Sequence, residues 1–199
     1  MVCMTPPCAS ERHGSPPITS LIALAKSRPG YLNFAVGGVP SHLTAELLRS
    51  SADIKVTFVP YKGAGPAFSD LVAGQVQAML GTVSTVLPFV QAGRMRALAV
   101  TSVERAPLLP NLPTVAQTLP GYDVTSFSGF GAPRGTPPEI VAQLQAEVVR
   151  ITNLPETKER LTAVGFETVG GTSEAFAALI KNDLARLGKV IRDANIRAE

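Results

Sequence analysis

Between residues 31 and 101 the sequence alternates between short apolar runs and longer stretches with helical spacing. This alternation constrains the fold more than any other feature. The short runs at 31–36, 55–60, 76–80 and 96–101 have the length and apolar content of buried strands. Glycine or proline separates each of the first three runs from a stretch in which apolar residues recur every three or four positions. Strands that alternate with helices are joined by right-handed crossovers, so the pattern predicts an α/β fold with a parallel, doubly wound sheet.

The chain divides into three parts on composition. Residues 1–18 are rich in proline and serine and carry no periodicity, so we expect a disordered leader. Residues 19–122, which end in a proline-rich stretch, form a complete α/β lobe in this prediction. Residues 123–199 begin with a strand-like stretch and continue as three helices, and we expect them to be an incomplete part of a second lobe, rich in helices.

Charge and motifs exclude several function classes. The 199 residues include 18 Lys and Arg against 15 Asp and Glu, and no run of five like charges occurs, so we expect no nucleic-acid partner. No apolar run reaches the length of a membrane span. The leader offers at most Cys3, Cys8 and His13 as metal ligands, which is fewer than a zinc site needs, and no nucleotide-binding motif is present. We therefore predict neither a metal nor another cofactor.

Three glycine-containing loops are the best candidates for a ligand site. The loops at 37–41, 61–65 and 81–84 each follow a predicted strand and lead into a predicted helix. In a parallel sheet these loops share one edge, where ligands bind. Unpaired N–H groups and the positive dipole end of each helix favour an anion there.

The side chains on these loops fit the same chemistry. Ser41, Thr82 and Ser84 add hydroxyl groups, and His42 or Lys62 adds positive charge. Carboxylates are scarce nearby, so a carboxylate or phosphate is the expected ligand. The alternative interpretation is that these residues are ordinary turn and capping residues.

Catalysis finds little support in the sequence. The predicted core contains no cysteine and no paired carboxylates, and the string at 126–131 lacks the leading glycine of a nucleophile elbow. We expect a protein that is not an enzyme. An enzyme that acts on a phosphorylated or carboxylated metabolite remains the less favoured alternative.

Three segments resemble a known family: VPYKGAGPAFSDLVAGQVQAML, GRMRALAVTSVERAPLLPNLPTVAQTLPGYDV and GFGAPRGTPPEIVAQL. They are similar to the Bug-type solute receptors of tripartite tricarboxylate transporters, and the similarity runs from about residue 21 to residue 199. Members are two-lobed periplasmic binding proteins of type II that bind a small carboxylate and deliver it to a membrane permease. The resemblance therefore implies a type II lobe, a carboxylate ligand, permease subunits as partners and a periplasmic location.

The resemblance also implies a set of ligand-binding residues. They are Gly38, Val39, Ser41, His42, Lys62, Gly63, Ala64, Gly65, Ala67, Gly81, Thr82, Ser84 and Phe127. Phe127 stands where members commonly have an aromatic residue, often Trp. Gly81 and Thr82 replace an Asp-Asn pair that many members carry.

The sequence departs from the family at its beginning. It has neither a signal peptide nor the N-terminal part of the first lobe, which in members includes a Pro-Gly-Gly-rich loop that grips the ligand. We expect a truncated receptor that self-associates through its incomplete lobe, and a cytoplasmic one if the start is genuine. The alternative is a non-functional gene fragment or a misassigned start.

Overall fold

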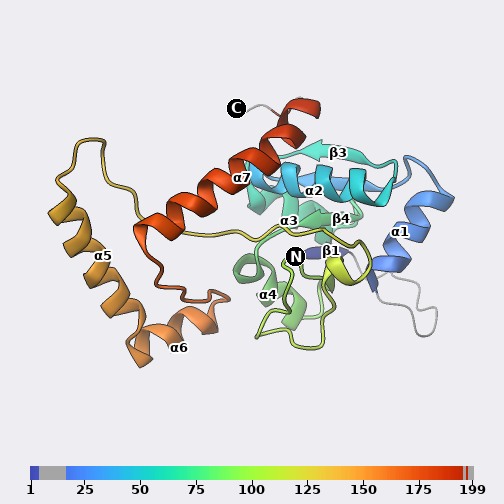
Figure 1. Ribbon diagram of the computed structural model, residues 1–199. Coiled ribbons are helices and arrows are strands. Elements are labelled where there is room, and N and C mark those ends of the chain that lie inside the picture. The colour runs from blue at the N-terminus through green and yellow to red at the C-terminus, as the bar shows by residue number, and fades with distance from the viewer. Residues whose placement is uncertain (5–16, 195, 197–199) are drawn as a thin grey trace. The chain divides into compact units, whose positions relative to one another are not determined.

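The structure is a computed structural model that describes residues 1–4, 17–194 and 196. It divides into two compact units, which are described separately. Unit 1 comprises Met1–Thr125 and Lys189–Glu199, and unit 2 comprises Ser126–Gly188 (Figure 1). The division thus falls three residues after the boundary at 122 that the sequence predicts, and the end of the chain returns to unit 1.

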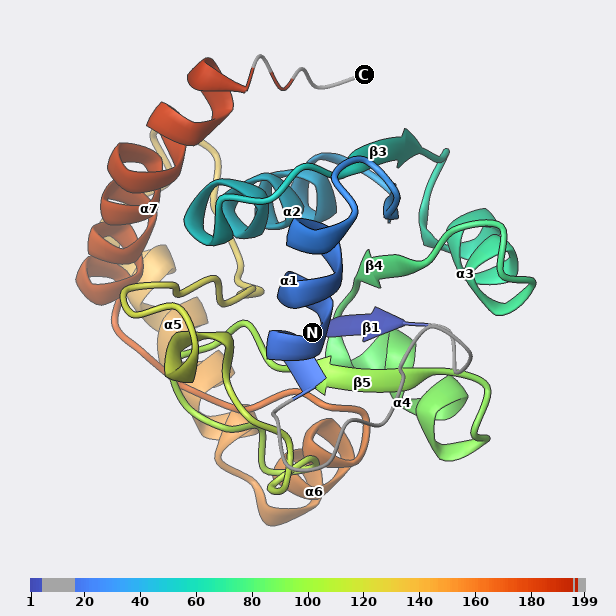
Figure 2. The same ribbon diagram turned by 90° about the vertical axis from the view of Figure 1, so that its right-hand side faces the viewer.

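Unit 1 is built on one five-stranded sheet. Its strands are β1 (Val2–Met4), β2 (Asn33–Val36), β3 (Thr57–Pro60), β4 (Ala78–Leu80) and β5 (Arg96–Ala99). They lie in the order β3-β2-β4-β1-β5. Figure 2 shows β3, β4, β1 and β5 following one another in this order from top to bottom. β2 is parallel to β3 and to β4, whereas β1 is antiparallel to β4 and to β5. Because β1 opposes both of its neighbours, β4 and β5 run in the same direction.

Helices cover both faces of this sheet. They are α1 (Pro17–Ser27), α2 (Val39–Ala52), α3 (Ala64–Val72) and α4 (Val83–Gln91). α1 and α2 pack with one face and α3 and α4 with the other, and each pair forms a buried apolar cluster with the strands. The strand period of two explains the division, since Phe34 and Val36 point to the first cluster and Ala35 to the second.

The segment that follows β5, residues 100–122, packs back on unit 1. It contains a short 3-10 helix, Val115–Gln117, whose first residue donates its N–H to the carbonyl of Val100 at 2.9 Å. Tyr122 follows, with 2% of its surface exposed, and its hydroxyl donates to the carbonyl of Thr44 in α2 at 3.0 Å. This segment therefore completes the core on the α1 and α2 side.

Unit 2 has far less internal packing. It contains α5 (Pro138–Thr152), α6 (Pro155–Ala163) and most of α7 (Ser173–Asp193), and none of these helices has a buried residue in the described structure. One aromatic contact lies at its start, where the rings of Phe127 and Phe176 meet edge to face with centroids 5.5 Å apart. Gly129 packs directly on Phe176, because a Cβ there would lie 2.5 Å from the ring.

The α/β fold and the parallel pairing of β2, β3 and β4 confirm the predicted fold class. One expectation, a disordered leader over residues 1–18, is wrong at two places. Val2–Met4 forms a central antiparallel strand and α1 begins at Pro17, so the leader is not disordered at these places. Residues 5–16, with Cys8 and His13, lie outside the described residues.

A further expectation fails in the C-terminal third. Residues 123–133 form no strand, although Val124 donates its N–H to the carbonyl of Thr101 at 2.9 Å. The residues Thr136–Glu139 match the sequence pattern of a capping box at the start of α5, but that capping box does not form. The helix is capped at Pro137, and the hydroxyl of Thr136 donates to the carbonyl of Pro133 at 2.8 Å instead.

Candidate functional site

The predicted site loops of unit 1 lie at one edge of the sheet. β3 and β4 both run parallel to β2, which lies between them, so the carboxyl ends of the three strands lie at the same edge. Each end is followed within four residues by the start of α2, α3 or α4. The structure therefore brings three helix N-termini to one place, as the sequence predicts.

None of these three helices has a side-chain cap. Their N-cap residues are Gly38, Gly63 and Thr82, and none of them accepts a hydrogen bond from its helix through a side chain. Gly38 and Gly63 have φ angles of 136° and 97°, which favour glycine over residues with a Cβ. The first-turn N–H groups thus lack their usual side-chain partner and can bind an anion.

The first two loops are held against each other by their backbones. A Cβ on Gly37 would lie 2.8 Å from the carbonyl oxygen of Gly63, so only glycine permits this approach. Tyr61 donates its N–H to the carbonyl of Val36 at 2.9 Å, and Gly63 donates to Tyr61 at 2.9 Å. The loops before α2 and α3 therefore form one contiguous surface.

The hydroxyl of Ser41 shapes its own loop. Its Oγ accepts the N–H of Gly37 at 2.9 Å and donates to the carbonyl of Gly38 at 2.9 Å. The hydroxyl proton of Ser41 is therefore engaged in a hydrogen bond within the loop. The backbone N–H groups of this loop are better placed than the hydroxyl to donate to a ligand.

A cluster of three hydroxyls marks the start of α4. The Oγ1 of Thr82 lies 3.0 Å from the Oγ of Ser84 and 2.9 Å from the Oγ1 of Thr85. Thr85 also donates to the carbonyl of Thr82 at 3.0 Å. The sequence analysis missed Thr85, although its spacing of three from Thr82 places both on one side of the first turn.

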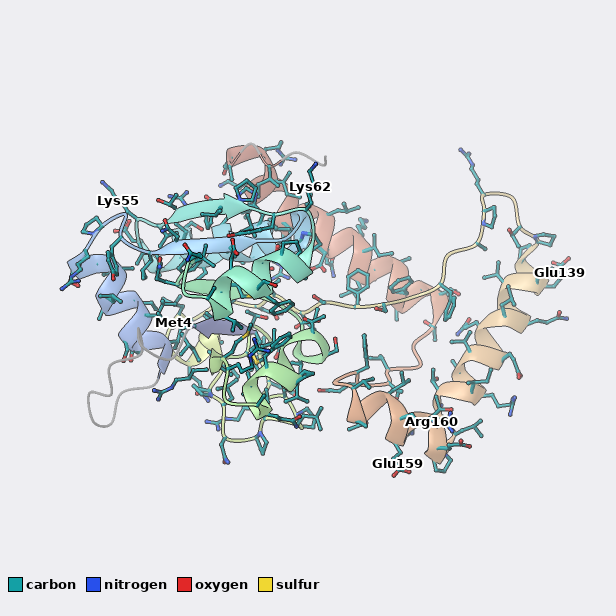
Figure 3. All side chains as sticks on the ribbon, turned by 180° about the vertical axis from the view of Figure 1, so that it is seen from behind. Met4, Lys55, Lys62, Glu139, Glu159 and Arg160 are labelled. Atoms are coloured by element: carbon teal, nitrogen blue, oxygen red, sulfur yellow. The ribbon has the colours of Figure 1, made fainter. Side chains whose placement is uncertain are left out.

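The two positively charged candidates differ in their surroundings. Lys62 is exposed, and its side chain extends away from unit 1 at one end of β3, with Lys55 at the other end (Figure 3). His42 is half-buried and its ring packs edge to face on Phe58, with centroids 5.0 Å apart. Lys62 is thus free to approach a ligand, whereas the ring of His42 is engaged in packing.

Tyr61 and Asp70 form a structural pair that the sequence analysis did not single out. The phenol of Tyr61 donates to Oδ2 of Asp70 in α3 at 2.8 Å. Partial desolvation, the hydrogen bond and the negative charge of Asp70 together raise the pKa of Tyr61 above its ordinary value. The bond ties the loop before α3 to the body of that helix.

The remaining candidates differ in position and burial. Val39 lies in the first turn of α2, and Ala64 and Gly65 lie in the first turn of α3, each with at least part of its surface exposed. Ala67 is fully buried in the cluster beneath α3 and α4, so its side chain belongs to the core. Phe127 lies in unit 2, where 45% of its surface is exposed, and so forms no part of the unit 1 surface described above.

Gly81 is a close-packed position as well as a loop residue. A Cβ there would lie 2.8 Å from Cγ2 of Val86, so a larger residue requires Val86 to move. The N–H of Gly81 donates to the carbonyl of Met1, the residue before β1, at 3.1 Å. This packing gives a physical reason why glycine is suited to this position here.

Two features are absent from the described residues. The described part of the chain holds no group of three or more His, Cys, Asp or Glu residues placed to bind a metal ion. None of its described helices has the length and apolar character needed to cross a bilayer.

Comparison with known proteins identifies a family. Residues 10–196 match the family described as "Tripartite tricarboxylate transporter family receptor". A "UPF0065 protein in tcbD-tcbE intergenic region" of Pseudomonas sp. (strain P51) is 40% identical over 185 residues, which are 91% of this chain and 55% of the relative. The chain spans about half the length of most of the curated relatives it matches.

Solved structures agree with the sequence comparison. "R. palustris Rpa4515 with adipate" is 33% identical, with a TM-score of 0.84 over 98% of this chain and 64% of that one. "MatC (Rpa3494) from Rhodopseudomonas palustris with bound malate" is 29% identical, with a TM-score of 0.77 over 96% of this chain and 65% of that one. Both ligands are dicarboxylates.

Proposed function

The chain belongs to the receptor family of tripartite tricarboxylate transporters, and on that premise we propose that it binds a small dicarboxylate at the start of α2, α3 and α4. Its family membership confirms the resemblance carried by the three sequence segments. In this proposal the protein binds its ligand without chemical change, acts in the periplasm and delivers the ligand to membrane permease subunits. Two structural neighbours that carry adipate and malate support the ligand class.

The observation that carries this proposal is the convergence of three helix N-termini without side-chain caps. One carboxylate can accept several backbone N–H groups at such an edge, and the helix dipoles add favourable charge. The proposed ligand-binding atoms are the backbone N–H groups of Ser41, Gly65 and Ser84 with those of their neighbours. Lys62 supplies a cation at the rim, and the hydroxyls of Thr82 and Ser84 orient the second carboxylate.

The experiment is calorimetric titration of the 199-residue chain with adipate and with malate. We expect saturable binding with a Kd weaker than about 1 μM, since unit 1 supplies only one face of a binding surface. Absence of binding up to about 10 mM would favour the alternative of a fragment without autonomous function.

A single substitution tests the location of the site. Val83→Pro removes the first N–H of α4 and is compatible with the helix, because proline is favoured at the first helical position. Thr82 has a ψ of 155°, which suits a residue that precedes proline. We expect dicarboxylate binding to weaken about tenfold or more.

The matched control is Ser173→Pro, which makes the same change at the first residue of α7 in unit 2. It should leave the dicarboxylate affinity unchanged. Equal affinity in the wild-type chain and in both variants contradicts the proposed site.

A further inference from the structure

A second concave surface of unit 1 lies at the opposite edge of the sheet from the loops described above. It is a groove of about 510 Å³ between the end of α4, the start of β5 and the proline-rich connection. Most of its lining residues are apolar, and those that bear on its chemistry are Met95, Arg96, Leu108, Leu109, Pro110 and Leu112. Because α4 begins at the carboxyl edge of the sheet and ends at the groove, the two surfaces are separated by the length of this helix.

The wall formed by the connection is fixed in place. Arg105 donates to the carbonyl of Pro110 at 2.8 Å, and Val100 donates its N–H to the carbonyl of Pro113 at 2.9 Å. Leu109 and Leu112 pack on the apolar cluster of α3 and α4. The groove therefore has a formed apolar floor, and its volume is in the range of small-molecule sites, about 300 to 1,000 Å³.

One charged group lines this apolar surface. Arg96 is half-buried, and within the described part of the chain it forms no ion pair with a carboxylate. From residue 71 to residue 122 the sequence contains a single acid, Glu104, against Arg94, Arg96 and Arg105. A partly desolvated guanidinium without a carboxylate partner is placed to pair with an external anion.

We propose that this groove is a second binding site, for a small organic monoanion with an apolar body, such as a medium-chain or aryl carboxylate. The apolar body lies against Leu109, Leu112 and Met95, and its carboxylate accepts hydrogen bonds from Arg96. This site is independent of the dicarboxylate site at the start of α2, α3 and α4.

The test uses octanoate as the probe, titrated into the full chain by calorimetry. Octylammonium, which has the same tail and the opposite charge, and adipate, which has two charges and a short polymethylene body, are the comparison ligands. We expect saturable octanoate binding, and at least tenfold weaker binding of octylammonium. Loss of a charge-assisted hydrogen bond corresponds to about this factor.

Two pairs of variants assign the binding to the groove. Arg96→Gln should weaken octanoate binding at least tenfold, whereas Arg94→Gln, an exposed neighbour outside the lining, should change it less than twofold. Leu108→Asp places a negative charge in the groove and should abolish the binding. Its control, Val103→Asp, lies on the same connection at a position with 58% of its surface exposed and should not.

Circular dichroism of each variant verifies that it folds. The inference is overturned if octanoate does not bind below about 10 mM, if octylammonium binds equally well, or if both members of either pair lose affinity alike. Adipate binding should weaken in the Val83→Pro variant and stay unchanged in the Arg96→Gln variant. This pattern distinguishes the dicarboxylate site from the groove.

Discussion

The α2 helix of unit 1 and the α5 helix of unit 2 have nearly the same length and both carry apolar residues at helical spacing. α2 buries five of its residues against the sheet, among them Leu43 and Leu48. α5 buries none, and Ile140 and Leu144 keep 43% and 57% of their surfaces exposed. An apolar stripe thus predicts a helix and the side of it that could be buried. The stabilisation that the helix gains depends on whether another part of the protein packs against that stripe.

The sharpest test of this comparison is a matched pair of leucine substitutions. Leu98→Ala, at a β5 position with 1% exposure, should lower the free energy of unfolding by about 2–5 kcal/mol through lost burial and the resulting cavity. Leu144→Ala on α5 should change it by less than about 0.5 kcal/mol. All three tyrosines, Tyr31, Tyr61 and Tyr122, lie in unit 1, so tyrosine fluorescence in urea reports on that unit, and circular dichroism follows the helices of both units in the same titration. Equal losses in the two variants contradict the comparison.

The second test concerns the polar contact that closes the core of unit 1. Tyr122→Phe leaves the carbonyl of Thr44 without its donor and should cost about 1–2 kcal/mol. Burial raises the pKa of Tyr122 well above the ordinary value of about 10. The unfolded chain therefore loses this proton first as the pH rises, so the contribution of Tyr122 to the stability of unit 1 should be constant below about pH 10 and should fall above it.

The Tyr122→Phe variant should show a smaller fall above pH 10 than the wild type, with Tyr61 accounting for part of what remains because its pKa is also raised. Tyr31→Phe, at a side chain with 49% exposure, is the control and should leave the pH profile unchanged. If the free energy of unfolding of the wild type rises between pH 10 and pH 11, the hydroxyl of Tyr122 is not buried as described.

The third test asks whether the exposed apolar residues of unit 2 drive self-association. Leu144 and Leu184 keep 57% and 69% of their surfaces exposed, and α5 and α7 carry further exposed apolar residues, among them Ile140 and Leu179. We expect the 199-residue chain to associate in sedimentation velocity experiments, because surfaces of this kind are rare on monomers. Leu144→Glu with Leu184→Glu should weaken the association at least tenfold.

Val103→Glu in unit 1 is the control for that double variant, since 58% of its surface is exposed on a connection outside unit 2. It should leave the association unchanged. A wild-type chain that sediments as a monomer at all concentrations excludes self-association through unit 2.

The same contrast explains how far the sequence could predict the fold. The runs that became β2, β3 and β4 were recognisable because each is a local apolar string that ends at glycine or proline. β1 was missed because Val2–Met4 is only three residues long in a proline-rich leader, and its place between β4 and β5 is set by pairing across nearly a hundred residues. The strand expected at 123–133 failed because no neighbouring strand pairs with it in the described structure.

Prediction of the candidate site had a similar limit. The three loops and their shared edge followed from topology, which spacing reveals. Side-chain roles did not follow, because they depend on contacts. Ser41 was expected at the start of its helix, yet Gly38 is the N-cap and the hydroxyl of Ser41 bonds to it. Nothing in the sequence distinguishes Ala67, which is buried, from Ala64, which is exposed at the start of the same helix.

The smallest expected effect comes from two ion pairs with identical spacing in the two units. Glu46 and Arg49 on α2 and Glu147 and Arg150 on α5 are both Glu-Arg pairs three residues apart. The side chain of Glu46 is 8% exposed and that of Glu147 is 54% exposed. Arg49→Met leaves a buried carboxylate without its partner, and should cost about 0.5–1 kcal/mol after allowance for the exposure of Arg49.

Arg150→Met should have no measurable effect on stability at physiological salt, because water and ions already screen that pair. The hydrogen bond from Arg150 lowers the pKa of Glu147, so its contribution is present above the ordinary carboxyl pKa and disappears as the pH falls through the lowered value. Urea unfolding at low and high salt, read by circular dichroism, measures both pairs. The loss of stability in Arg49→Met should persist in high salt, since a buried carboxylate is poorly screened. If that loss disappears in high salt, Glu46 is solvated to the same extent as Glu147 on α5.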